Sequence, residues 1–96
     1  GFAVTVTDAE ILAAIPALAR GAGVFAEPAA AATYAGLVKA VASGRLRGGE
    51  TIVLLVTGSG LKDVQSALRA SGRPHRVGVG MAELRRLVAR EKIGRI

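Results

Sequence analysis

The residues best suited to chemistry form a short polar turn, Thr57-Gly58-Ser59-Gly60, directly after an apolar run and directly before a helical pattern. In open α/β sheets, ligands bind beyond the carboxyl ends of strands, and a helix N-terminus presents free N–H groups to anions. The turn lacks the Gly-Lys-Ser/Thr ending of a nucleotide-binding P-loop, and Asp63 stands where a dinucleotide-binding fingerprint needs a third glycine. The spacing therefore leaves two interpretations open, a ligand loop and a plain tight turn.

Other reactive side chains are few. Glu27 precedes Pro28 at a helix start, where a carboxylate most often interacts with the helix dipole. The single histidine, His75, lies in a basic turn and receives no role. The amines of Lys39 and Lys62 are of the type that binds a carbonyl carbon, but both are placed as solvated charges. With no Cys and one His, we assign no metal-binding residue and no catalytic residue.

Two segments of the chain, in order and correctly spaced, resemble those of a known family. Residues 24–31 (VFAEPAAA) resemble the F-x-E-P-A-x-A segment of threonine synthases. Residues 51–63, which end in LVTGSGLKD, look like their L-T-G-x-G-L-K-D segment, and VTDAEI at 6–11 fits their leading V-T-D-x-E-I. The resemblance covers residues 1–63, and residues 64–96 add no recognisable motif.

The resemblance implies a cofactor and a reaction. Threonine synthases are pyridoxal-phosphate (pyridoxal 5'-phosphate, PLP) enzymes of fold type II that convert O-phosphohomoserine and water to threonine and phosphate. By this resemblance, the hydroxyl of Thr57 would donate a hydrogen bond to the pyridine nitrogen of the cofactor. The two glycines that follow would give the ring room. Gly58 and Glu27 would also contact the cofactor, with Ala29 and Ala30 near the ring.

Other family features have no counterpart in the sequence. The lysine that binds the cofactor covalently, in an S-F-K-x-R-like segment, and the glycine-rich phosphate loop are not found, and the chain begins at Gly1 without Met. We therefore expect a C-terminal segment of a threonine synthase, a cytoplasmic lyase of threonine biosynthesis, that is inactive alone. We expect residues 1–96 to be one segment of a larger domain, with residues 1–63 threonine-synthase-like and 64–96 a basic extension.

Two alternatives to this assignment remain open. Another fold type II lyase, such as a threonine or serine dehydratase, would use the same Thr57 position. A protein of a different class, an anion- or nucleic-acid-binding module, would use the Gly58-Ser59-Gly60 turn together with the basic C-terminal third.

The hydrophobic pattern predicts strands alternating with helices. Residues 51–57 form a continuous apolar run, which is typical of a parallel strand covered on both faces. Shorter strands are expected at residues 4–6 and 76–79. Helices are expected over about 8–20, 28–43, 61–71 and 81–92. We therefore expect an α/β fold, in which helices pack on a small, mostly parallel sheet of about three strands within the large domain of a fold type II enzyme.

Charge is concentrated at one end of the chain. Of 96 residues, 51% are hydrophobic, and the formal net charge of +6 arises wholly from residues 64–96. Basic segments most often lie on solvated helix faces, and no aromatic residue beyond Tyr34 offers a base-stacking platform, so nucleic acid is a disfavoured partner. We expect the partners to be the remainder of the parent enzyme and a second copy of the chain, with no membrane association.

Overall fold

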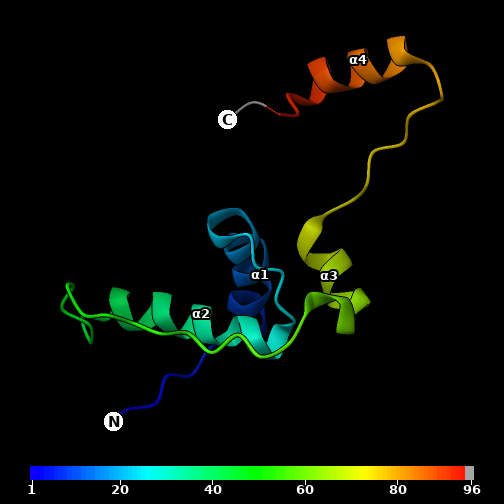
Figure 1. Ribbon diagram of the computed structural model, residues 1–96. Coiled ribbons are helices and arrows are strands. Elements are labelled where there is room, and N and C mark those ends of the chain that lie inside the picture. Colours follow the sequence, from blue (N-terminus) through cyan, green and yellow to red (C-terminus); the bar gives the residue numbers. More distant parts are fainter. Residues whose placement is uncertain (95–96) are drawn as a thin grey trace.

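The computed structural model describes residues 1–94, which fold as helices joined by extended segments (Figure 1). In chain order the elements are α1 (Asp8–Ala22), α2 (Pro28–Ala42), a 3-10 turn η1 (Gly60–Lys62), α3 (Val64–Ser71) and α4 (Met81–Glu91). Over residues 1–94 there is no β-strand and no sheet, so the predicted α/β fold with a parallel sheet is wrong. The predicted helices are present, with ends within a few residues of those expected.

The predicted central strand lacks a neighbouring strand. A strand is defined by hydrogen bonds to a second strand beside it, and within residues 1–94 the only bridge of this kind is an isolated antiparallel one between Ala26 and Ser59. The apolar run at 51–57 is consequently uncovered, with Val53 78% exposed and Leu55 72% exposed. The side chain of Val56 alone packs against the helical core. The run has the composition of a buried strand, but composition alone does not determine whether a second strand lies beside it.

α1 begins and ends where local chemistry requires. The backbone N–H of Glu10 donates to Oγ1 of Thr7 at 3.2 Å, and the N–H of Thr7 donates to the Glu10 carboxylate at 2.6 Å, which completes a capping box. At the other end, Gly23 adopts the left-handed conformation (φ 66°) that glycine tolerates best, and its N–H donates to Ala19 O.

The core lies between α1 and α2 and is built largely of alanine. α2 begins at Pro28, whose fixed φ suits the first helical turn. Its Ala30 and Ala31 pack against Ile15 and Leu18 of α1. Because alanine is small, the two helices cross closely (Figure 1). The other buried or partly buried members of this core are Val6, Ile11, Leu12, Ala14, Ala26, Tyr34, Ala35, Val56 and Ala70.

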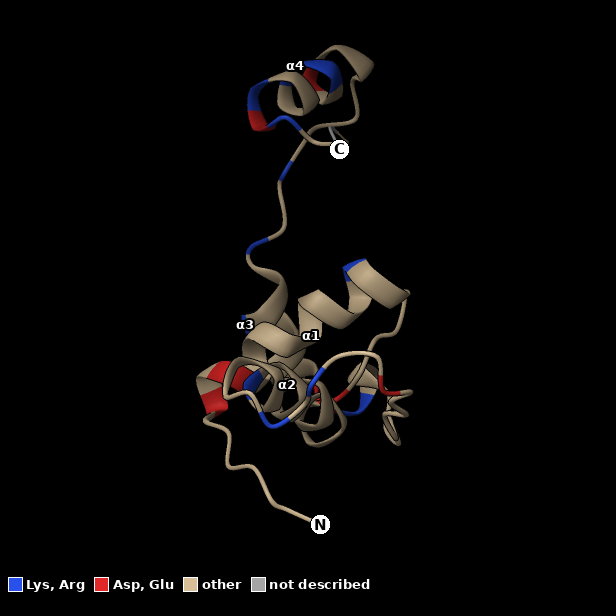
Figure 2. Ribbon diagram, turned by 90° about the vertical axis from the view of Figure 1, so that its left-hand side faces the viewer, with Lys and Arg blue, Asp and Glu red and all other residues tan. Residues whose placement is uncertain are grey.

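α4 stands apart from the other helices. α3 packs against α1, and residues 1–71 are called the body below. Residues 72–94, called the arm, are an extended linker followed by α4, which projects away from the body in both views (Figures 1 and 2). The radius of gyration is therefore 17.0 Å, whereas a compact domain of this length would have about 12.5 Å. None of the helices among residues 1–94 is long and apolar enough to cross a lipid bilayer.

Candidate functional site

The two polar segments singled out in the sequence lie side by side. The N–H of Glu27 donates to Gly58 O at 3.0 Å, and the N–H of Gly60 donates to Phe25 O at 2.9 Å. Between these bonds, Ala26 pairs with Ser59 and is fully buried. We call residues 25–27 and 58–60 the clasp. Residues 28–57 separate its two halves in the sequence. The clasp is therefore a tertiary contact that joins the start of α2 to the start of η1.

The two glycines of the clasp are required by side chains of this same chain. A Cβ atom on Gly58 would overlap the Glu27 carboxylate, and a Cβ atom on Gly60 would overlap the Phe25 ring. Both glycines are buried. By the family resemblance, these glycines were predicted to leave room for a cofactor ring. In the structure, Glu27 and Phe25 occupy the space directly over them.

Among residues 1–94, one cation lies beside the Glu27 carboxylate. Nζ of Lys62 lies 3.9 Å from Oε1 of Glu27, whose side chain is only 22% exposed. Lys62 itself is mostly exposed, so this ion pair is a weak one. It places a positive charge beside the Glu27 carboxylate, which itself lies directly over Gly58.

Thr57 lies immediately before the clasp and is exposed. Its hydroxyl takes part in no hydrogen bond among residues 1–94. Ser59, by contrast, accepts a hydrogen bond from the N–H of Leu61 at 3.3 Å and so caps η1. Of the two hydroxyls in the turn, that of Thr57 is therefore the one free to bind another molecule.

Asp63 has a structural role at the start of α3. Its carboxylate accepts hydrogen bonds from the backbone N–H of Ser66 at 2.9 Å and from the Ser66 hydroxyl at 2.8 Å. These bonds, the backbone one foremost, hold the pKa of the Asp63 carboxyl below its ordinary value. The residue that departs from the dinucleotide-binding pattern is thus an N-cap, and it fixes the direction in which α3 leaves the clasp.

The structure brings together Thr57, Gly58 and Glu27, the three predicted cofactor-binding residues, and places Lys62 beside Glu27, but His75 and Lys39 lie elsewhere. His75 is exposed on the linker of the arm, and Nζ of Lys39 pairs with Glu10 at 3.4 Å, away from the clasp. Within residues 1–94, no cluster of three or more metal-ligating side chains occurs.

Sequence reasoning missed the contact between Phe25 and Gly60 and the pairing of Lys62 with Glu27. A signal was present in the chain. Large residues at the alternate positions 25 and 27 match glycines at the alternate positions 58 and 60, as expected for two segments that pair face to face.

Comparison with known proteins gives a consistent result. Residues 1–58 match the protein family described as pyridoxal-phosphate dependent enzymes. The threonine synthase of Halalkalibacterium halodurans is 56% identical over 63 residues, which are 66% of this chain and 18% of that protein. The threonine synthase of Mycobacterium leprae is 54% identical over 63 residues, which are again 66% of this chain and 18% of that protein.

A further relative extends the similarity toward the arm. The threonine synthase of Methanocaldococcus jannaschii is 44% identical over 88 residues, which are 92% of this chain and 22% of that protein. This match is too long to stop at Asp63, so the basic C-terminal third is similar to a threonine synthase as well. The chain spans about a fifth of the length of the curated relatives it matches.

Proposed function

Because the chain belongs to the family of pyridoxal-phosphate dependent enzymes, we propose that it forms the part of a threonine synthase that contacts the pyridine ring of the cofactor. The parent reaction is then the conversion of O-phosphohomoserine and water to threonine and phosphate. The threonine synthases matched at 44–56% identity support this assignment over a dehydratase. Since the proposed reaction belongs to amino-acid biosynthesis, we place the parent enzyme in the cytoplasm.

The observation that carries the proposal is the free hydroxyl of Thr57 beside the clasp. This hydroxyl is exposed and has no hydrogen-bond partner among residues 1–94. A neutral hydroxyl donates a hydrogen bond to an unprotonated ring nitrogen, whereas a carboxylate at the same place would hold that nitrogen protonated. The residues present therefore suit a pyridine ring whose nitrogen is uncharged.

The clasp gives this hydroxyl a fixed position. The peptide after Thr57 is held by the hydrogen bond from Glu27 N–H to Gly58 O. The Glu27 carboxylate covers Gly58, so Glu27 and Gly58 together set how far the Thr57 hydroxyl can move. When bound, the cofactor supplies an electron sink for the bond changes at the substrate's α-carbon, and the uncharged ring nitrogen tunes how strongly it withdraws electrons.

We also propose that residues 1–96 alone do not catalyse the reaction. The family's lysine and phosphate loop are not found in this sequence, so the clasp would act together with the remainder of a threonine synthase. Thr57 is accordingly assigned to direct cofactor contact, Glu27 and Gly58 are assigned to positioning Thr57, and no catalytic residue is assigned within the chain.

The test is a chimeric enzyme. The 88-residue matching segment of the Methanocaldococcus jannaschii threonine synthase is replaced by the corresponding residues of this chain. Cofactor absorption and threonine formation are then measured for the chimera and for Thr57→Val, which removes the hydroxyl while keeping the shape. We expect Thr57→Val to shift the absorption maximum of the bound cofactor and to lower kcat about 10–100-fold.

Two variants serve as controls. Thr57→Ser keeps a hydroxyl and is expected to retain the spectrum, and Thr51→Val removes an exposed hydroxyl from the other end of the same run. The proposal fails if the chimera does not take up the cofactor, or if Thr57→Val behaves like Thr51→Val in both measurements.

A further inference from the structure

The Glu27 carboxylate lies beside the proposed cofactor contact and carries a negative charge there. It covers Gly58, which directly follows Thr57. Because Cα atoms joined by a trans peptide are about 3.8 Å apart, the carboxylate lies within about 7 Å of the Thr57 Cα atom. A negative charge at that distance favours the protonated form of a nearby base. Left unbalanced, Glu27 would therefore oppose the uncharged ring nitrogen that a hydroxyl partner suits.

α2 itself does not neutralise this carboxylate through a hydrogen bond. Glu27 is the N-cap residue of α2, but its side chain accepts no hydrogen bond from the first turn of the helix. The side chain is 22% exposed, so water reaches it only in part. Among residues 1–94, the ionic partner of Glu27 is Lys62, whose Nζ lies 3.9 Å from Oε1. The counter-charge of the carboxylate thus comes from the other half of the chain's polar turn.

The backbone around Lys62 ties this cation to the clasp. The N–H of Lys62 donates to Ser59 O at 3.1 Å, and the N–H of Asp63 donates to Gly60 O at 3.3 Å. The Ser59 hydroxyl accepts the N–H of Leu61 at 3.3 Å. These bonds form η1 directly on two residues of the clasp. The position of the lysine in the chain is therefore set by the same turn that follows the Thr57 hydroxyl.

Two further elements bring charged groups to cavities at the edge of the clasp. α1 contributes Asp8 and Arg20, and α3 with its cap contributes Asp63 and Arg69. Asp63 accepts two hydrogen bonds from Ser66, and Arg69 donates to the Ser66 hydroxyl at 3.4 Å. None of these four groups forms an ion pair with the clasp carboxylate among residues 1–94. Two carboxylates and two arginines also add no net charge at this edge.

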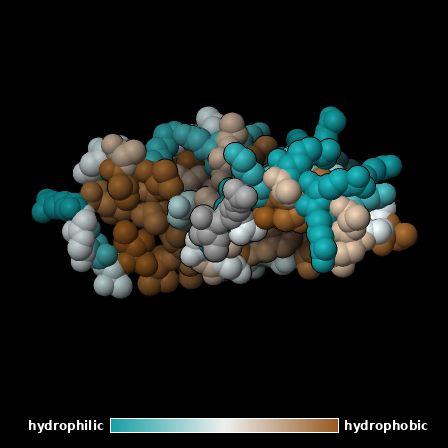
Figure 3. Space-filling model, turned by 90° about the horizontal axis from the view of Figure 1, so that it is seen from above, coloured by the Kyte–Doolittle hydropathy of each residue, from teal (hydrophilic) through white to brown (hydrophobic). Residues whose placement is uncertain are grey.

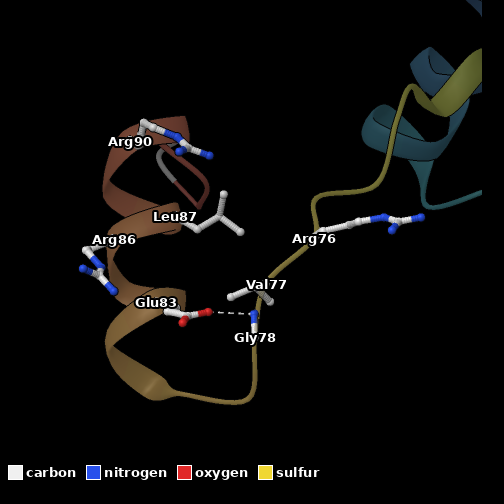
Figure 4. A pocket seen from close by; sticks show the side chains of 7 residues that line it. All are labelled: Arg76, Val77, Gly78, Glu83, Arg86, Leu87 and Arg90. Atoms are coloured by element: carbon white, nitrogen blue, oxygen red, sulfur yellow. Dashed lines mark hydrogen bonds between the residues drawn. The ribbon is translucent and has the colours of Figure 1, made fainter.

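The basic arm is the remaining source of positive charge, and it lies elsewhere. α4 projects away from the body (Figures 1 and 2). One carboxylate of the arm, on Glu83, accepts the N–H of Gly78 at 2.9 Å, and the side chains of Arg76 and Arg86 point in different directions (Figure 4). Figure 3 shows hydrophilic side chains gathered at one end of the view and apolar surface toward the other. Lys62 is therefore the cation that the described part of the chain places on the clasp carboxylate.

We propose that Lys62 is a positioning residue of the cofactor site: its ammonium group balances the charge of Glu27, so that the Thr57 hydroxyl donates to an uncharged ring nitrogen. This inference rests on the proposed function. It gives the lysine of the L-K-D segment an electrostatic role that differs from that of the family's covalent lysine. Because the ion pair is largely exposed, it contributes little to folding. Its effect is expected on the ring nitrogen.

The experiment uses the chimeric enzyme described above, loaded with pyridoxal 5'-phosphate that carries ¹⁵N at the ring nitrogen. The ¹⁵N chemical shift, followed from pH 5 to pH 9, reports whether this nitrogen is protonated. Lys62→Gln removes the balancing charge and is expected to raise the pH midpoint of protonation by about 1 unit, a ~10-fold gain in proton affinity. Lys62→Arg keeps the charge and the wild-type midpoint. Lys39→Gln is the matched control, since Lys39 pairs with Glu10 away from the clasp.

A double variant shows whether Lys62 acts through Glu27. Glu27→Gln combined with Lys62→Gln removes both charges, so the midpoint is expected to return to the wild-type value. The proposal is overturned if Lys62→Gln leaves the midpoint unchanged, or if the double variant keeps the full shift of Lys62→Gln. If Thr57→Val does not alter the cofactor spectrum, the proposed function fails and this inference with it. If Thr57→Val alters the spectrum while Lys62→Gln does not move the midpoint, the role of Lys62 alone fails.

A second measurement, on the 96-residue chain without cofactor, separates charge from shape. The N–H groups of Glu27 and Gly60 donate across the clasp, so their amide hydrogen exchange reports whether the clasp is closed. We expect Lys62→Gln to leave the exchange of both amides within about twofold of wild type. Loss of their protection in Lys62→Gln would show that the lysine holds the clasp together, and it would overturn the electrostatic role.

Discussion

The body and the arm are held in place by different kinds of interaction. In the body, α1, α2 and the clasp bury small apolar side chains, and Ala26 and Ala31 are fully buried. In the arm, Leu87 alone is buried, and the hydrogen bonds described are all local to residues 78–93. Charge follows the same division, since the excess of Arg and Lys lies toward the arm (Figure 2).

This difference shows what decides the position of an element. The helical pattern of α4 is as clear as that of α1, and both helices form where the sequence predicts them. α1 is fixed because a second helix and the clasp pack on it, whereas among residues 1–94 the main support of α4 is its own linker. Local pattern therefore determines that a helix forms, and tertiary burial determines where it stays.

The largest expected effect comes from the centre of the body. Ile15 is 4% exposed, so Ile15→Ala removes buried apolar atoms and leaves a cavity between α1 and α2. We expect the free energy of unfolding to fall by about 2–4 kcal/mol, measured by urea denaturation. Val79→Ala, at a fully exposed position of the arm, is the matched control and should change it by less than about 0.5 kcal/mol. Equal losses from the two variants would show that the arm is packed like the body.

The next effect separates the clasp from the helices that flank it. In Gly60→Ala the new Cβ atom meets the Phe25 ring, which must rotate away from Ala26 and expose the clasp. We expect a loss of about 1–3 kcal/mol in the free energy of unfolding. Gly36→Ala is the control, because the space beside Gly36 in α2 is open, and there a helical alanine should stabilise by about 0.5–1 kcal/mol. A Gly60→Ala variant as stable as wild type would mean that Phe25 does not hold the clasp closed.

A smaller effect is expected at the start of α1. Thr7→Ala removes the side-chain oxygen that accepts the Glu10 N–H, and so it breaks half of the capping box. The expected cost is about 0.5–2 kcal/mol, read from the thermal midpoint. Thr7→Ser retains the hydroxyl and should lose much less. If both variants lose the same amount, packing of the threonine methyl group rather than capping accounts for the effect.

The helices could be predicted from sequence because their signals are local. The capping box at Thr7, Pro28 at the start of α2 and Gly23 after α1 are each read from a few neighbouring residues. The sheet could not be predicted correctly, because a strand needs a partner and the apolar run at 51–57 has none among residues 1–94. The run has the composition of a buried strand, but Val53 and Leu55 remain exposed. The apolar character of a segment predicts that it should be buried, but it does not predict which other part of the protein covers it.

The candidate site was predictable in part for the same reason. Thr57, Gly58 and Glu27 were found through two sequence segments, and the structure brings those segments together. What each glycine contacts could not be derived from spacing, because that depends on the register in which residues 25–27 meet residues 58–60. Glu27 and Phe25 fill the space over the glycines that the sequence had suggested for the cofactor ring. The hydroxyl of Thr57, by contrast, is exposed and free of hydrogen bonds among residues 1–94.

The smallest expected effect concerns pH and contrasts the caps of α3 and α4. Asp63 caps α3 through its side chain, whereas Gly80 caps α4 without one. Since the hydrogen bonds from Ser66 lower the pKa of the Asp63 carboxyl from its ordinary value of 3.8, the cap stabilises α3 fully above that value. The stabilisation is lost as the pH falls through the lowered pKa. Amide hydrogen exchange between pH 5 and pH 2.5 should therefore show α3 losing protection relative to α4, and Asp63→Asn should abolish the dependence. If α3 and α4 lose protection together in wild type, the acid sensitivity belongs to the chain as a whole and the cap is not its cause.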